Sequence, residues 1–212
     1  MYIHFGRRDI VMNGISRSIF ATISVCLTAL VGFSGCANTA KTVDSATELD
    51  NATSATADTV VFGKFRLVRN GYEAKLGSSI IANNATLHLY HQDGHEKVVG
   101  RVGRDGEFAW ILKPGSYRVS SIGFYNRGDK VEPATDFTFN VPARNEAIYV
   151  GTITLETTFD SGFLGVNGTV DRYTVANECA TYCAARLEQL GLSADSATVA
   201  LMQDNSQFAR RN

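Results

Sequence analysis

The stretch that decides the fold class reads Arg104-Asp-Gly-Glu-Phe-Ala-Trp-Ile-Leu-Lys-Pro-Gly-Ser-Tyr-Arg-Val119. Phe108, Trp110 and Leu112 fall on one face of an extended chain by the two-residue period of a strand, and the alternation resumes at Tyr117 after the Pro-Gly turn. We therefore predict a β-hairpin with one packed face. Trp110, the single tryptophan, is expected in the core.

Further strands are expected on both sides of this stretch. Alternating apolar residues separated by Asn-Gly, Asp-Gly and similar turn signals predict strands at 59–68, 85–92, 97–102, 117–125, 136–142 and 147–157. About seven short strands without intervening helices predict an all-β sandwich over residues 59–170.

The spacing of the aromatic residues carries a family resemblance. The pattern Gly106-x-Phe108-x-Trp110-x-Leu112-x-Pro114-Gly115-x-Tyr117 resembles prealbumin-like modules of the carboxypeptidase regulatory-like and Cna-B-like kinds. The stretches 139–143 and 149–153 are similar to the closing strands of such domains in bacterial envelope lipoproteins. The resemblance implies a prealbumin or immunoglobulin-like sandwich, and it implies little about function, because these motifs are structural.

The charge of the chain argues against nucleic acid as a partner. The chain has 212 residues and a formal net charge of -1, with no long run of Lys or Arg. Nucleic acid is therefore not an expected partner, because the basic patch that neutralises phosphates is missing.

The N-terminus is typical of an export signal. Residues 18–33 form an uncharged apolar run that follows Arg7, Arg8 and Arg17. A basic head followed by a short apolar run predicts a signal peptide over residues 1–35. If translation starts at Met12 instead of Met1, the basic segment before the apolar run has the ordinary length for a signal peptide. Both translation starts are therefore considered.

The end of this run, Phe33-Ser-Gly-Cys36, resembles the bacterial lipobox. The resemblance implies that Cys36 carries the acyl chains, palmitate among them, that anchor the protein to a membrane. Ala37 is not the Asp that marks retention in similar inner-membrane lipoproteins, so the expected location is the outer membrane, facing the periplasm. Two alternatives are an ordinary Cys36 beside a conventional cleavage site and an apolar run that stays in the membrane.

The segments that flank the sandwich differ in composition. Residues 36–58 are rich in Ala, Thr, Ser and Asp, which predicts a flexible tether behind the lipidated cysteine. Residues 171–212 are expected to be a C-terminal helical segment, with a helix over 177–190 and a second short helix over 193–202.

Cys179 and Cys183 lie four residues apart within the first expected helix. Export to an oxidising compartment favours a disulfide between them, although Cβ atoms four apart on a regular helix are about 5 to 6 Å from each other, farther than a disulfide needs. Two unpaired thiols on the packed face, or a metal or redox role, are the alternatives.

No catalytic, cofactor or metal site is predicted. His88 and His91 should point to opposite faces of a strand, and His95 follows the next turn, so the three do not form a ligand set. The sequence has no nucleophile elbow, phosphate loop or zinc-binding helix motif.

Two functional hypotheses remain, because the third, a hydrolase with a scattered active site, has no nucleophile and base pair that the sequence supports. The first is a non-enzymatic envelope lipoprotein that binds another envelope component, with the loop 125–134 as a candidate surface. The alternative is a periplasmic carrier of a small ligand or carbohydrate. An unpaired sheet edge would favour a protein partner by strand addition, whereas a cluster of exposed Tyr and Phe would favour the carrier.

Overall fold

The computed structural model describes residues 38–45, 48–49, 58–76, 85–126, 129–143, 147–162 and 165–205. The chain divides into two units, Met1–Gly35 and Cys36–Asn212, and every described residue belongs to the second. The predicted signal peptide therefore lies outside the described residues.

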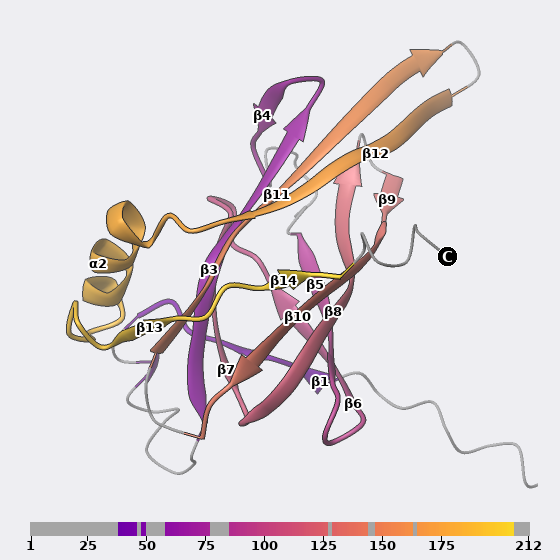
Figure 1. Cartoon of the computed structure of the whole chain (residues 1–212). Coiled ribbons are helices and arrows are strands. Elements are labelled where there is room, and N and C mark those ends of the chain that lie inside the picture. Colours follow the sequence, from indigo (N-terminus) through magenta and orange to yellow (C-terminus); the bar gives the residue numbers. More distant parts are fainter. Residues whose placement is uncertain are drawn as a thin grey trace, which may run out of the picture. The chain divides into compact units, whose positions relative to one another are not determined.

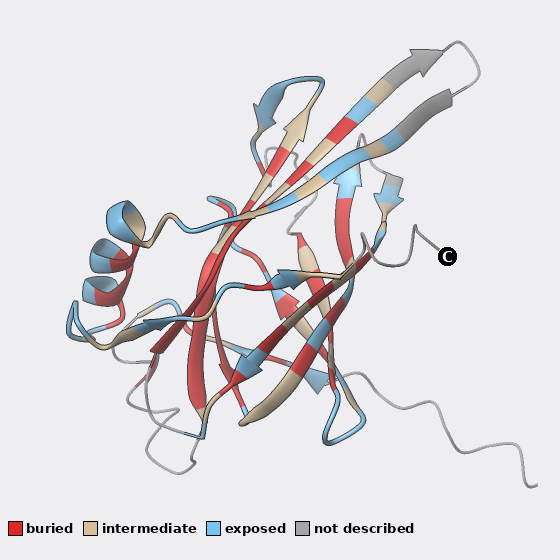
Figure 2. Ribbon diagram, in the orientation of Figure 1, coloured by how far each residue is buried: buried red, intermediate tan, exposed pale blue. Residues whose placement is uncertain are grey.

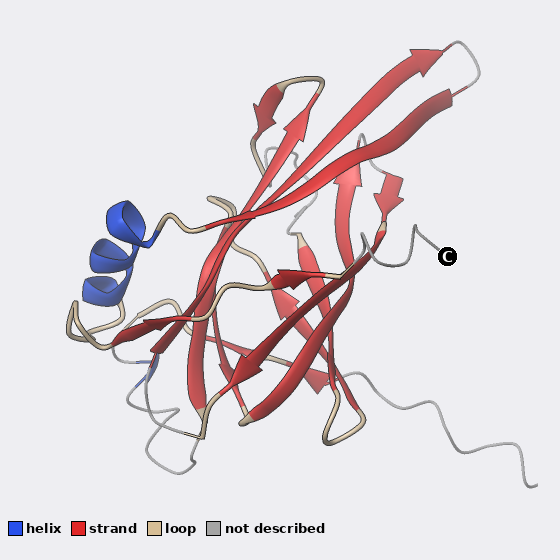
Figure 3. Cartoon of the chain, viewed as in Figure 1, coloured by secondary structure: helices blue, strands red, loops and turns tan. Residues whose placement is uncertain are grey.

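The described residues of the second unit form an all-β sandwich to which helix α2 is added, which confirms the predicted fold class (Figures 1 and 3). The elements in chain order are β1 (Asn38–Thr39), β2 (Lys41–Thr42), β3 (Thr59–Arg69), β4 (Tyr72–Ala74), β5 (Thr86–His91), β6 (Glu96–Arg101), β7 (Glu107–Leu112), β8 (Gly115–Asn126), β9 (Asp129–Val131), β10 (Ala134–Val141), β11 (Ala147–Gly162), β12 (Gly165–Ala176), α2 (Cys179–Gln189), β13 (Ala197–Val199) and β14 (Gln203–Asp204).

The strands of the described residues form two sheets of seven. In sheet A the order is β1-β6-β5-β8-β10-β14, with β9 paired to β8. In sheet B the order is β12-β11-β3-β7-β2, with β13 paired to β11 and β4 to β3. Most pairs are antiparallel, but β3 and β11 run parallel at the centre of sheet B.

The main core lies between the two sheets (Figure 2). Sheet B contributes Phe108 and Trp110, whose rings stack with their centroids 4.1 Å apart, and sheet A contributes Leu87 and Val119. Trp110 is fully buried, as predicted, and its indole Nε1–H donates a hydrogen bond to the backbone oxygen of Arg101 at 2.8 Å. The two-residue alternation of β7 therefore sets the core as the sequence indicates.

The predicted hairpin over 104–119 is wrong, although both of its strands exist. β7 pairs with β3 and β2 in sheet B, whereas β8 pairs with β5 and β10 in sheet A. The link at Pro114 therefore crosses from one sheet to the other, and the Tyr117 hydroxyl donates to the backbone oxygen of Lys113 at 3.1 Å to hold it. Alternation shows which face of a strand is buried but not which strand lies beside it.

Helix α2 covers the outer face of sheet B and forms a second core there. Cys183, Leu187 and Leu190 from the helical segment are buried together with Phe62 and Tyr149 of the sheet. The predicted helix over 177–190 is thus confirmed with slightly shorter ends, and sheet B is buried on both faces. Ala180, three residues before the buried Cys183, is exposed.

Part of the segment 36–58, predicted as a tether, lies on the sheets instead. Asn38–Thr39 pairs parallel with β6, Lys41–Thr42 pairs antiparallel with β7, and Ala40, Val43 and Leu49 are buried. Composition predicted disorder because few side chains in the segment are apolar. Those few nevertheless meet open sheet edges, where backbone hydrogen bonds add to their burial.

The second helix predicted over 193–202 is also wrong. Its β-branched residues Thr198 and Val199 belong to β13, which pairs parallel with β11. The chain then passes to sheet A, where β14 pairs with β10, and Met202 between the two short strands is buried. The C-terminal segment therefore joins both sheets (Figure 1).

Candidate functional site

Cys36, the predicted lipidation residue, lies outside the described residues, so its modification stays a prediction. The described chain begins two residues later, where Asn38 and Thr39 pair with Val98 and Val99 of β6. Within the described residues, the structure has no helix that is both long and apolar enough to cross a membrane.

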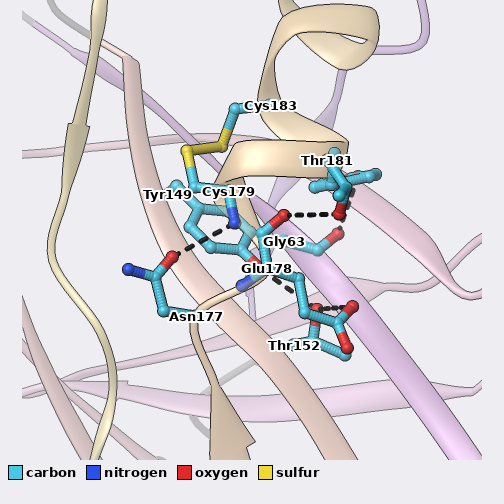
Figure 4. The surroundings of a disulfide bond; sticks show 9 residues. Gly63, Tyr149, Thr152, Asn177, Glu178, Cys179, Thr181 and Cys183 are labelled. Carbon is cyan, nitrogen blue, oxygen red and sulfur yellow. Dashed lines mark hydrogen bonds between the residues drawn. A yellow bond between two sulfur atoms is a disulfide. The ribbon is translucent and has the colours of Figure 1, made fainter.

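Cys179 and Cys183 form a disulfide within α2, with their Cα atoms 4.7 Å apart (Figure 4). Cys183 is buried against sheet B, and the backbone N–H of Cys179, the first residue of α2, donates to the side-chain oxygen of Asn177 at 3.1 Å. Both sulfur atoms are thus bonded to each other. The pair stabilises a packed helix and offers no thiol for metal or redox chemistry in this state.

Glu178 fixes the start of α2 to sheet B (Figure 4). Its carboxylate accepts hydrogen bonds from Arg66 Nη1 at 2.5 Å and from Thr152 Oγ1 at 3.0 Å, and its backbone N–H donates to the Tyr149 hydroxyl at 3.3 Å. Burial raises the pKa of Glu178, but the hydrogen bonds from Arg66 and Thr152 outweigh it and hold the pKa below its usual value of 4.5. The ionised carboxylate therefore stabilises the docked helix.

The histidines lie as the strand period predicts. His88 points to the outer face of sheet A, His91 is buried, and His95 sits in the β5–β6 turn with a positive φ of 51°. His91 stacks on Tyr117 with the ring centroids 4.7 Å apart. Among the described residues, no group of three or more His, Cys, Asp or Glu side chains is placed to hold a metal ion.

One cluster on sheet A has the composition of a hydrolase site. The Thr86 hydroxyl lies 3.4 Å from Nε2 of His88, whose Nδ1 lies 3.5 Å from the Glu132 carboxylate. Both distances exceed the 2.6 to 3.2 Å expected between a nucleophile, its base and the group that orients it. Ser121 donates to the same carboxylate oxygen at 2.9 Å, so Glu132 already has a shorter hydrogen bond than the one His88 could give.

The loop predicted as a binding surface, 125–134, is largely strand. β8 continues to Asn126, and β9 turns back to pair with it between Asp129 and Val131. Lys130 and Glu132 form an ion pair at 2.7 Å. The region is therefore a short hairpin extension of sheet A.

The strand β12 is the long edge of sheet B. Within the described part of the chain, β12 (Gly165–Ala176) pairs only with β11, so its other edge has no paired strand there. Val170, Tyr173 and Val175 point to the core side and remain half-exposed, whereas Asp171 and Arg172 are both exposed on the outer side.

Sequence reasoning missed this strand because of a β-bulge. The register of β11 against β12 shifts between Glu156 and Thr157, where Asp171 is the extra residue. Two adjacent outward residues interrupt the alternation at that point. The domain boundary expected between 170 and 171 consequently falls inside β12.

The far part of the β11–β12 pair extends beyond the rest of sheet B as a two-stranded ribbon (Figure 1). Asn70 anchors its base, because its side-chain amide donates to the backbone oxygen of Phe159 at 3.1 Å and accepts from the Phe159 N–H at 2.8 Å. The Arg69 guanidinium lies 5.2 Å from the centre of the Phe159 ring. The ribbon base is therefore fixed while its outer edge stays unpaired among the described residues.

Comparison with known proteins adds no relative: no protein-family model matches the chain, and no curated protein matches its sequence.

Proposed function

We propose that this protein is a non-enzymatic lipoprotein of the bacterial cell envelope. An acylated Cys36 anchors it to the outer membrane on the periplasmic side. The protein binds another envelope protein along β12. The observation that carries the binding proposal is the unpaired edge of β12, because an open edge is the feature that distinguishes strand addition from a ligand carrier.

The side chains of β12 indicate the kind of segment that fits. Its core-side residues Val170, Tyr173 and Val175 pack against the core yet stay half-exposed, so a neighbouring strand would complete their burial. On the other side, Arg172 is paired with Glu156 of β11 at 2.5 Å and Asp171 accepts hydrogen bonds from Thr158 and Thr169, so this side is polar and its charges are already balanced. The partner segment is therefore extended, with alternating apolar and polar residues, and gains main-chain hydrogen bonds to the edge.

The cluster of exposed Tyr and Phe that would favour the carrier is not found among the described residues. Tyr72 is 80% exposed and Tyr125 is 39% exposed, but they lie on different sheets and do not form a cluster. The sandwich core is filled by side chains from both sheets.

An anchor on Cys36 would hold the domain close to the lipid. Asn38 already belongs to sheet A, and two residues of extended chain span at most about 7 Å. The described structure thus leaves no room for the long tether expected from composition.

Intact mass of the membrane-extracted protein tests the anchor. We expect a chain that begins at Cys36 and carries acyl groups, and we expect the Cys36→Ser variant to lose both the acyl mass and the membrane fraction. An unmodified chain in the soluble fraction would contradict the anchor.

A photo-crosslinking amino acid placed at Thr174, on the exposed outer side of β12, tests the partner proposal in living cells. We expect one discrete adduct with another envelope protein, and none from the same probe at the exposed Glu188 of α2. Val175→Lys should abolish the adduct because a charge on the core side blocks strand pairing, whereas Val175→Thr should retain it. Adducts of equal yield at both positions, or an adduct only with a second copy of this chain, would refute a separate protein partner.

A further inference from the structure

A groove of about 360 Å³ lies on the outer face of sheet A, over β6, β5 and β8. It is lined by polar and charged side chains, among them His88, Tyr90, Lys97, Arg118 and Glu132. The groove is on the opposite sheet from β12, so it is independent of the partner-binding edge.

The strand register puts three of these side chains in one row. Tyr90 lies directly opposite Lys97 on β6 and opposite Arg118 on β8. Neighbouring strands are about 4.8 Å apart, so Tyr90 lies in this row between two cationic residues. Tyr90 is half-exposed, and Lys97 and Arg118 are exposed.

The two cations retain donors for a ligand. Arg118 forms an ion pair with Asp136 through Nε at 2.8 Å, its one hydrogen bond to a side chain among the described residues. Lys97 forms no ion pair within the same part of the chain. The Tyr90 hydroxyl lies 3.0 Å from Nδ1 of His95, which holds the ring in place.

The next row supplies hydrogen-bonding groups of both kinds. His88 lies 3.5 Å from Glu132, and the Ser121 hydroxyl donates to the same carboxylate. A register shift between His88 and Leu89 makes Ser120 an extra residue on β8, so that Ser120 and Ser121 both line the groove. Bulges of this kind redirect side chains beside binding sites.

We propose that this groove binds an anionic sugar, that is, a hydroxylated six-membered ring with one carboxylate or phosphate group. The Tyr90 ring provides an apolar face with a polar rim on which a sugar ring can stack. Lys97 and Arg118 attract the anionic group, and the bidentate fork of Arg118 suits both carboxylate and phosphate. His88, Glu132 and the serines provide partners for the ring hydroxyls. A purely apolar ligand would leave these groups unpaired.

Saturation-transfer NMR on the full chain in detergent micelles tests the proposal. Glucuronate and glucose 6-phosphate are the probes, and glucose and acetate are the controls. We expect transfer to the ring protons of at least one anionic sugar, weak or absent transfer to glucose, and no displacement of the sugar by equimolar acetate. If glucose binds as well as the anionic sugars, charge plays no part in recognition and the proposal is wrong. If acetate displaces the sugar, the groove is a general anion site and not a sugar site. Absence of transfer to both anionic sugars would also overturn the proposal.

Matched variants locate the binding. Tyr90→Ala should weaken binding by about two- to tenfold through loss of the stacking face, while Tyr72→Ala, at an exposed tyrosine of sheet B, should not. Lys97→Gln should weaken it roughly two- to fivefold at low salt, and this loss should vanish at high salt because exposed charges are screened. Lys41→Gln is the control on β2. Equal losses in test and control variants with unchanged thermal unfolding would place the sugar elsewhere.

Discussion

Gly100 of β6 is the position where the smallest change should reveal how the sandwich core is packed. A Cβ atom added there would lie 2.5 Å from Cζ2 and 2.6 Å from Cε2 of the Trp110 ring. Carbon atoms in contact are normally 3.5 to 4.0 Å apart, so Gly100→Ala requires the ring to move by about 1 Å. The ring has little freedom to do so, because it stacks on Phe108 and its N–H is bonded to the Arg101 backbone oxygen.

Two opposing effects decide the size of the change. Replacing Gly by Ala gains roughly 0.4 to 1 kcal/mol by restricting the unfolded chain, provided that the backbone accepts the new residue. Overpacking a filled core costs about 1 to 3 kcal/mol, and a weakened indole hydrogen bond adds up to about 1 kcal/mol. We therefore expect Gly100→Ala to lower the free energy of unfolding by about 1 to 3 kcal/mol, which is a fall in Tm of roughly 2 to 12 °C for a domain of this size.

Thermal unfolding followed by circular dichroism measures the loss, and the fluorescence of the single tryptophan reports the ring displacement. The control is the same change in a Trp110→Phe background, where the smaller ring leaves space for the methyl group. We expect Gly100→Ala to cost at least about 1 kcal/mol less there, which is a coupling typical of residues in contact. Equal losses in both backgrounds, or a stabilised single variant, would refute the steric explanation.

Three further predictions concern the helix and the ribbon. Glu178→Gln should lower the free energy of unfolding by about 1 kcal/mol at pH 7. A carboxyl whose pKa is lower in the folded state stabilises the fold above its unfolded value, so the difference from the native protein should shrink as the pH in urea titrations falls below 4.5. Asn70→Ala removes both hydrogen bonds to Phe159. Hydrogen exchange of the ribbon amides should therefore become at least about tenfold faster, while the amides of the sandwich stay protected. Ribbon amides that stay as protected as in the native protein would contradict the role of Asn70 as an anchor. Reduction of Cys179–Cys183 should cost at most about 2 kcal/mol in chemical unfolding because the loop it closes is short, and a larger loss would mean that the helix depends on it.

The sequence predicts the strands of this domain better than their partners. Alternation identified which side chains of β7 enter the main core and that His88 and His91 lie on opposite faces, because each depends on residues only two or three apart. It did not show that the other face of β7 is buried too, under α2. The hairpin failed for a different reason. Pro114 and Gly115 suit a tight turn, yet the same two residues link strands that face each other across the core, and only the full set of tertiary contacts selects between these pairings.

The N-terminal segment shows the limit of composition. Ala40, Val43 and Leu49 are too widely spaced to produce a periodic signal, yet each is buried. A two-residue strand gains its stability from the sheet that it joins rather than from its own residues. Arg186, nearly buried in α2, lies 3.9 Å from the Asp44 carboxylate and so links this segment to a helix far away in the sequence. A contact between residues so far apart in the chain cannot be predicted from the local sequence pattern.

Both candidate surfaces arise where a strand departs from its own period. Ser120 and Ser121 are adjacent polar residues between the buried Val119 and Ile122, and in β12 the exposed Asp171 and Arg172 interrupt the alternation in the same way. A strict alternation would have sent one residue of each pair into the core, where an unpaired hydroxyl or charge is costly. A bulge places both residues outside and keeps the apolar residues beyond them facing inward. Adjacent polar residues within an otherwise alternating strand are therefore a signal in the sequence itself, and they indicate a bulge rather than the end of the strand.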